Sequence, residues 1–124
     1  MGFLGFQQIH SKTLLGHTPQ NKYIRAIKIT YFVHGTTTDN ERHISSGWKD
    51  VELSELGVQQ SIALKVQTKD QKFDVIFCSG LKRAHDSAKL AWEGIYHIIP
   101  DARLRECSYG TLNGASSDIV ESMQ

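Results

Sequence analysis

Short apolar segments alternate along this chain with segments of helical periodicity, and this alternation constrains the fold more than any other feature. Strand-like runs of β-branched and aromatic residues cover residues 26–33, 73–78 and 95–99. Between them, residues 54–68 and 81–92 place apolar side chains three or four positions apart. Strands that alternate with helices predict a mainly parallel sheet with right-handed crossovers, hence an α/β fold.

Each predicted helix has an apolar face that we expect to be buried. Ser54 is placed to cap the first helix. The face of the first helix comprises Leu56, Val58, Ile62, Ala63 and Val66, and that of the second Leu81, Ala84, Ala88, Ala91 and Trp92.

The chain of 124 residues has the length of one domain. Residues 1–25 contain no steady period, and we interpret them as a leader of uncertain structure, either poorly ordered or lying on the domain surface. Residues 26–124 form the predicted domain, in which the polar segment 34–50 is a long loop. Three strands make a small sheet, so the architecture is that of an incomplete domain.

Composition excludes several classes of function. Fourteen basic and thirteen acidic residues leave a net charge of +1, which predicts neither nucleic-acid nor membrane binding. No apolar run reaches the ~18 residues of a membrane span. Two cysteines at positions 78 and 107 form neither a disulfide framework nor a zinc-ligand pattern. We therefore expect a cytoplasmic protein without metal or cofactor.

Chemically capable residues follow the ends of the predicted strands, which is where open α/β sheets bind ligands. His34 follows the first strand, Arg83 opens the helix after the second, and Glu106 comes shortly after the third. A neutral imidazole is a good nucleophile toward phosphorus, and a guanidinium matches the oxygens of a phosphate. A carboxylic acid can protonate the leaving oxygen. The three together predict phosphoryl transfer.

At these positions the sequence resembles the histidine phosphatase superfamily, also called the phosphoglycerate mutase-like family. The resemblance extends from about residue 28 to residue 114 and consists of four blocks in order. They are Val33-His34-Gly35 with Thr37 and Asn40; Gly47-Trp48-Lys49-Asp50 with Leu53, Gly57 and Gln60; Phe73-Asp74 with Ile76, Ser79, Leu81, Arg83 and Ala84; and Leu104, Glu106, Tyr109-Gly110 and Gly114.

The resemblance implies a fold, a substrate class and a set of residue roles. The fold is a three-layer sandwich with a mainly parallel sheet, and the substrate is a small phosphorylated molecule. His34 is the nucleophile that becomes phosphorylated, and Glu106 is the proton donor. Substrate-binding residues are then Arg83, Asn40, Gly35, Thr37, Ser46 and Gly47.

Two departures from the family pattern bear on activity. Val33 stands where the family has arginine, and the loss of one preorganised donor lowers the rate by a factor of about 10² to 10³. The family's second active-site histidine, in a Ser-His-Gly-like block, has no counterpart in these 124 residues.

These observations leave three interpretations of the chain open. The first is a metal-independent phosphatase, favoured over a mutase because no feature marks a phosphoglycerate site. The second is a non-catalytic relative that binds a phosphorylated ligand or a protein. The third is a fragment of a longer phosphatase or phosphomutase. An incomplete sheet also predicts homo-oligomers that form through open sheet edges.

Overall fold

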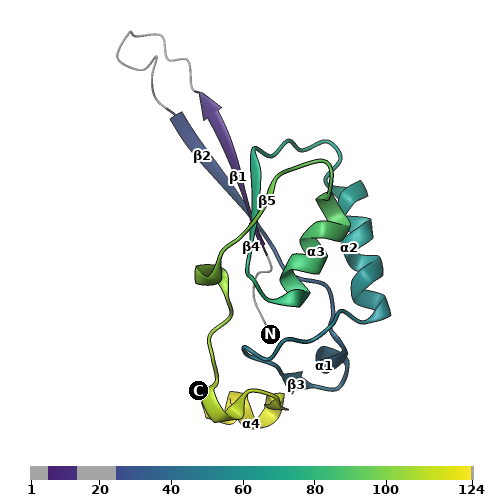
Figure 1. Cartoon of the computed structure of the whole chain (residues 1–124), viewed down its shortest axis with the longest axis vertical. Helices are drawn as coiled ribbons and strands as arrows, with labels where there is room; N and C mark the ends of the chain where they lie inside the picture. Colours follow the sequence, from purple (N-terminus) through teal and green to yellow (C-terminus); the bar gives the residue numbers. More distant parts are fainter. Residues whose placement is uncertain (1–5, 14–24, 124) are drawn as a thin grey trace.

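The computed structural model describes residues 6–13 and 25–123, and its main feature is a four-stranded sheet (Figure 1). The strands are β1 (Phe6–Thr13), β2 (Arg25–Phe32), β4 (Val75–Cys78) and β5 (Ile98–Pro100), in the spatial order β2-β1-β4-β5. Strand β1 is antiparallel to both of its neighbours, and β4 is parallel to β5. Three of the four strands therefore run in one direction, which confirms the mainly parallel α/β fold.

The central position of β1 corrects the sequence-based interpretation of the leader. Its residues 6–9 pair with β2 on one side and with β4 on the other. The leader thus contributes a strand inside the sheet and separates β2 from β4. Sequence periodicity missed this strand because backbone hydrogen bonds, which any side chain permits, are what join it to its neighbours. Residues 1–5 and 14–24 lie outside the described residues, and the boundary at residue 25 stays a prediction.

Helices α2 (Glu55–Gln67) and α3 (Lys82–Trp92) pack against each other on the same face of the sheet (Figure 1). Of the three layers that the sequence predicted, the described residues therefore contain two. Strands β2 and β5 lie at the two edges of the sheet. Association of copies through these edges stays a prediction.

The core lies between α3 and the sheet and is rich in aromatic rings. Phe73, Ile76 and Trp92 are buried, and the ring centroids of Phe73 and Trp92 are 5.9 Å apart. Phe32 at the end of β2 completes the group, with its ring centroid 5.0 Å from that of Trp92. The predicted apolar face of α3 is buried as expected, including Leu81 in front of the helix.

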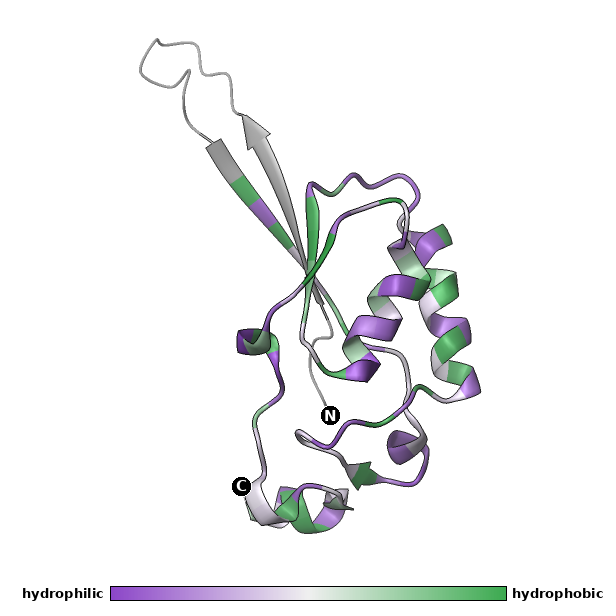
Figure 2. Ribbon diagram, viewed as in Figure 1, coloured by the Kyte–Doolittle hydropathy of each residue, from purple (hydrophilic) through white to green (hydrophobic). Residues whose placement is uncertain are grey.

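The prediction that α2 buries its apolar face is wrong. Leu56, Ile62 and Val66 are 49% to 65% exposed, and Figure 2 shows green bands along this helix. The buried residues of α2 are Gly57 and Ser61. Small side chains face inward here because α2 lies close to the backbone that leaves β2, and this leaves no space for branched ones.

Smaller elements surround the end of the sheet where β2 and β4 finish. The predicted loop 34–50 contains helix α1 (Thr38–Glu41) and strand β3 (Ile44–Ser45), so it is more regular than expected. Strand β6 (Ala115–Ser116) pairs with β3. The remaining elements are the 3₁₀ helices η2 (Ala102–Leu104) and η3 (Gly110–Leu112), and helix α4 (Ser117–Ser122).

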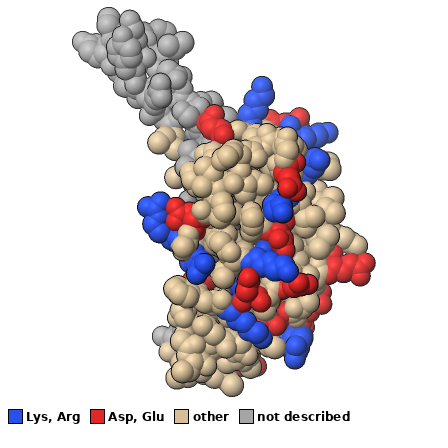
Figure 3. Space-filling view, viewed as in Figure 1, with Lys and Arg blue, Asp and Glu red and all other residues tan. Residues whose placement is uncertain are grey.

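Charged side chains of both signs are mixed over the surface shown in Figure 3, without a region of a single sign. This distribution agrees with the nearly balanced charge of the sequence. Within residues 6–13 and 25–123, no helix has the length and apolar character needed to cross a bilayer.

Gly57 marks the closest approach between α2 and the segment after β2. A Cβ atom at this position would lie 1.9 Å from the carbonyl oxygen of Thr36, and one at Gly35 would lie 2.4 Å from the carbonyl oxygen of Gly57. The Ser54 amide and hydroxyl both donate to Thr36 O, at 2.9 and 3.1 Å. The two backbones are therefore held in direct contact.

We predict that Gly57→Ala lowers the free energy of unfolding by about 1–3 kcal/mol, because the added methyl group forces the two backbones apart. An alanine in a helix ordinarily stabilises it relative to glycine, so the sign itself is diagnostic. Urea unfolding followed by circular dichroism measures the change. Gly80→Ala is the matched control, since its Cβ would meet only the Arg105 side chain, at 3.5 Å. Equal midpoints for both variants and the wild type would contradict the prediction.

Candidate active site

A cavity of about 390 Å³ lies beyond the end of β2, enclosed by the 34–47 segment, the start of α3 and the segment that leads to α4. It brings together seven of the eight residues predicted from sequence. They are His34, Thr37, Asn40, Ser46, Gly47, Arg83 and Glu106. The imidazole, the guanidinium and the carboxyl group of the sequence-based hypothesis therefore do meet in one place.

His34 lines this site and has one ring nitrogen without a hydrogen-bond partner in the described part of the chain. Its Nδ1 donates to the carbonyl oxygen of Gly35 over 2.7 Å, so Nδ1 carries the proton in the neutral ring. Nε2 is buried and has no hydrogen-bond partner among the described residues. Burial lowers the pKa of His34 below its ordinary value of about 6.5. The ring is therefore neutral at pH 7, with a lone pair on Nε2.

Arg83 is 4% exposed and is anchored to the loop after β3. Its Nη2 donates to the carbonyl oxygen of Gly47 at 2.8 Å, and Nη1 donates to that of Lys49 at 3.3 Å. Gly47 has a φ of +56°, and a Cβ there would lie 1.9 Å from Asn113 Oδ1, so only glycine fits. Burial lowers the pKa of Arg83, although an arginine stays protonated at neutral pH.

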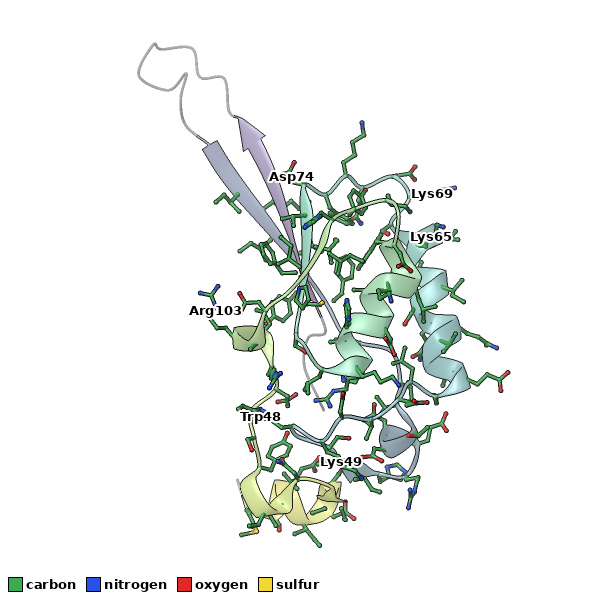
Figure 4. The ribbon with its side chains drawn as sticks, viewed as in Figure 1. Trp48, Lys49, Lys65, Lys69, Asp74 and Arg103 are labelled. Atoms are coloured by element: carbon green, nitrogen blue, oxygen red, sulfur yellow. The ribbon has the colours of Figure 1, made fainter. Side chains whose placement is uncertain are left out.

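The backbone of Glu106 is fixed by Trp48. The indole Nε1 donates to the Glu106 carbonyl oxygen at 2.6 Å, and the guanidinium of Arg105 lies 5.5 Å from the centre of the indole ring. Figure 4 shows Trp48 beside the segment that runs from Arg103 toward α4. From the sequence we expected Trp48 to be a packing residue that closes the loop, and its indole joins the backbone of Glu106 to the loop that Arg83 holds.

Thr37 and Asn40 cap the short helix α1 at the cavity wall. The Asn40 amide donates to Thr37 Oγ1, and the Thr37 amide donates to Asn40 Oδ1, both at 3.0 Å. Because Oδ1 is occupied in this way, the Nδ2 group of Asn40 is the part of its side chain that remains to donate to a ligand. This reciprocal pairing fixes the rotamer of Asn40.

The hydroxyl group of Ser46 is oriented by a hydrogen bond to a buried carboxylate. Its hydroxyl donates to Asp39 Oδ2 at 2.9 Å, and Asp39 is only 4% exposed. Lys49 Nζ lies 3.9 Å from the same oxygen. The hydroxyl proton of Ser46 is thus engaged by Asp39, and the residue offers a ligand its backbone and its lone pairs.

Gly35 is the predicted site residue that does not line this cavity. Its amide donates to Ser87 Oγ at 2.9 Å, and the Ser87 hydroxyl donates to the carbonyl oxygen of Arg83 at 2.7 Å. The position also requires glycine because of its contact with Gly57. Gly35 therefore links His34 to α3, a structural task that the sequence pattern did not separate from ligand binding.

Several residues that line the cavity were not predicted from sequence. His43, Ser117 and Glu121 lie on the wall formed by β3, β6 and α4, and Tyr109 lies beside Glu106. His43 has a φ of +55°, which a non-glycine residue seldom adopts. Burial and the Glu106 carboxylate raise the pKa of Tyr109. The sequence signal that could have identified Ser117 and Glu121 is their spacing of four residues, which places both side chains on one face of a helix.

The arrangement combines a nucleophile, a cation and a carboxyl group in one cavity. No cluster of His, Cys, Asp and Glu within the described ranges could hold a metal ion. Cys107, adjacent to Glu106, is exposed, and its thiol donates to Glu106 Oε1 at 3.5 Å. Cys78 is buried in β4, and burial raises its pKa to about 11.

Comparison with known proteins agrees with this geometry. The profile of the histidine phosphatase superfamily (branch 1) matches residues 31–124. The chain therefore belongs to the histidine phosphatase superfamily. A 2,3-bisphosphoglycerate-dependent phosphoglycerate mutase of Streptococcus agalactiae is 37% identical over 94 residues, which is 71% of this chain and 41% of the mutase. One from Bartonella tribocorum is 34% identical over 93 residues, covering 70% and 45% of the two chains.

Solved structures give the same result for the fold. YhfR of Bacillus stearothermophilus superimposes with a TM-score of 0.66 and 31% identity, covering 73% of this chain and 45% of that one. Phosphoglycerate mutase of Bacillus anthracis gives a TM-score of 0.64 and 30% identity, covering 69% and 40%. A phosphoserine phosphatase of Entamoeba histolytica gives 0.63 and 26%, covering 71% and 44%. The chain spans less than half the length of these relatives.

We predict that His34 titrates below pH 6.5 and carries its proton on Nδ1 at pH 7. Long-range ¹H–¹⁵N NMR spectra of the imidazole nitrogens report both properties. Because the folded pKa is depressed, protonation favours the unfolded chain, so this group lowers stability as the pH falls from about 6.5 toward the folded pKa. The same imidazole in the urea-unfolded chain serves as the reference. An Nε2-protonated ring, or a pKa in the folded chain that is not below that of the unfolded chain, would refute the assignment.

Proposed function

We propose that this chain is a histidine-type phosphatase that acts on small phosphate monoesters through a phosphohistidine at His34. The observation that supports this most directly is the unpartnered Nε2 of His34 inside a cavity that also contains Arg83 and Glu106. The mutases and the phosphoserine phosphatase among its relatives bear names that denote small phosphorylated substrates.

In the first step, the Nε2 lone pair of His34 attacks phosphorus while the bond from phosphorus to the ester oxygen breaks. The Nδ1–H bond to Gly35 O holds the ring in the tautomer that this requires and stabilises the positive charge that develops on it. Glu106, in its protonated form, transfers a proton to the departing oxygen. The alcohol leaves, and the phosphoryl group stays on His34.

Arg83 supplies the charge that the phosphoryl oxygens need. Its guanidinium is already oriented by the carbonyl oxygens of Gly47 and Lys49, so it requires little reorganisation when substrate binds. The amide of Asn40 and the backbone of Ser46 and Gly47 supply further contacts. In the second step, water attacks phosphorus, gives a proton to Glu106, and releases phosphate from His34.

Val33 limits the rate of this chain. Its side chain is 58% exposed and lines the cavity next to His34, where it offers no hydrogen bond to a phosphoryl oxygen. This observation favours a second candidate function, a non-catalytic relative that binds a phosphorylated ligand through Arg83.

A cytoplasmic location of the protein stays a prediction.

Trapping of the phosphoenzyme distinguishes the two candidates. We expect ³²P from a labelled aryl phosphate to become bound to the wild-type chain through an acid-labile, alkali-stable bond, as is typical of phosphohistidine. His34→Asn should abolish the label, and the exposed His97→Asn should retain it. An unlabelled wild type that still binds inorganic phosphate, with binding lost in Arg83→Ala, would instead support the non-catalytic candidate.

We predict that Val33→Arg increases kcat/KM for an aryl phosphate by about 10- to 100-fold. A second guanidinium beside His34 adds a donor for the charge that develops on the phosphoryl oxygens in the transition state. Val33→Leu is the control, since it changes size without adding a donor. A Val33→Arg variant with the rate of Val33→Leu would show that the position does not face the transferred group.

A further inference from the structure

The cavity contains few positive charges for a site that accepts phosphate esters. Among the described residues that line it, Arg83 is the only lysine or arginine, whereas Glu106 and Glu121 are both carboxylic. Of the histidines of the lining, His34 is neutral at pH 7 because burial lowers its pKa. Among the described lining residues, Arg83 therefore supplies the one guanidinium available to a ligand.

The guanidinium of Arg83 is held at the end of the cavity where His34 lies. Its Nη groups bind the carbonyl oxygens of Gly47 and Lys49, which fixes the guanidinium beside the loop. Lys49, the next cation along that loop, is paired with Asp39 at 3.9 Å and does not line the cavity. Figure 4 shows Lys49 above α4. Helix α4, with β3 and β6, forms the wall of the cavity opposite His34, which we call the opposite wall.

That opposite wall carries hydroxyl groups and one carboxylate. Strands β3 and β6 pair there, and the Ser45 hydroxyl donates to Ser117 Oγ at 3.1 Å. The Ser117 amide donates to the carbonyl oxygen of His43 at 2.9 Å, which holds the start of α4 against β3. Glu121 follows one turn later on α4 and lines the same cavity.

We propose that a ligand whose phosphoryl group lies at His34 extends its alcohol portion toward this wall, where Glu121 determines specificity. The cavity then selects phosphate monoesters with a neutral or cationic alcohol portion and disfavours those with a second anionic group. The inference rests on the proposed function and narrows its substrate class. A carboxylate or second phosphate placed there meets Glu121, and Arg83 is the only lysine or arginine among the described residues of the lining, whereas an ammonium or hydroxyl group meets an acceptor.

Three ligands of matched length test the proposal. They are 3-aminopropyl phosphate, glycerol 3-phosphate and 3-phosphoglycerate, whose far ends carry a cation, a hydroxyl group and a carboxylate. Isothermal titration calorimetry with the full chain at pH 7 and low salt measures binding without requiring turnover. We expect 3-phosphoglycerate to bind about five- to tenfold more weakly than the other two, since the repulsion acts at a partly exposed site.

Variants of α4 assign that difference to one residue. Glu121→Gln should bring the three affinities to within about twofold, and Glu121→Lys should make 3-phosphoglycerate the tightest ligand. Asp118→Asn on the same helix, which is exposed and outside the cavity lining, is the matched control and should preserve the wild-type order.

Two different failures remain distinguishable. Equal affinities in the wild type, or a preference that survives in Glu121→Gln, would overturn the charge-selection proposal while leaving phosphate binding intact. Absence of binding by all three ligands and by inorganic phosphate would overturn the proposed function itself, and the inference with it.

Discussion

The contact between the Thr36 backbone and the start of α2 is the constraint on which the site depends. Gly57 permits an approach that any side chain would block, and Ser54 fixes it with two hydrogen bonds to Thr36 O. Gln60 Oε1 accepts from the Thr36 amide and hydroxyl on the next turn. Because the segment after β2 is held on α2, the backbone beside His34 is fixed, and the Nδ1 hydrogen bond to Gly35 O orients the ring.

The site is built from such backbone anchors more than from contacts between side chains. Arg83 is oriented by two carbonyl oxygens, His34 by a third and Trp48 by a fourth, all from the loops that surround the cavity. A group that is already held in place loses little entropy when substrate binds, and its dipoles need not reorient. Preorganisation of this kind suits a phosphoryl group, whose charge must be met by fixed donors.

The predictability of the fold differed between the two helices for a physical reason. The apolar face of α3 was evident from the spacing of Ala84, Ala88, Ala91 and Trp92, because that face packs on the sheet. On α2, Leu56, Ile62 and Val66 are exposed and the buried residues are Gly57 and Ser61, since the helix packs closely against the backbone after β2. Strand β1 could not be predicted, because its place depends on backbone pairing with two strands distant in sequence.

The sequence by itself determined the alternation of β2, α2, β4, α3 and β5 and pointed to His34, Arg83 and Glu106, since local periodicity and motif spacing are properties of neighbouring residues. Tertiary structure alone decided that these three share a cavity, that Gly35 serves α3 through Ser87, and that Glu121 forms the opposite wall. Those features depend on segments far apart in the chain, and only folding brings them within contact distance.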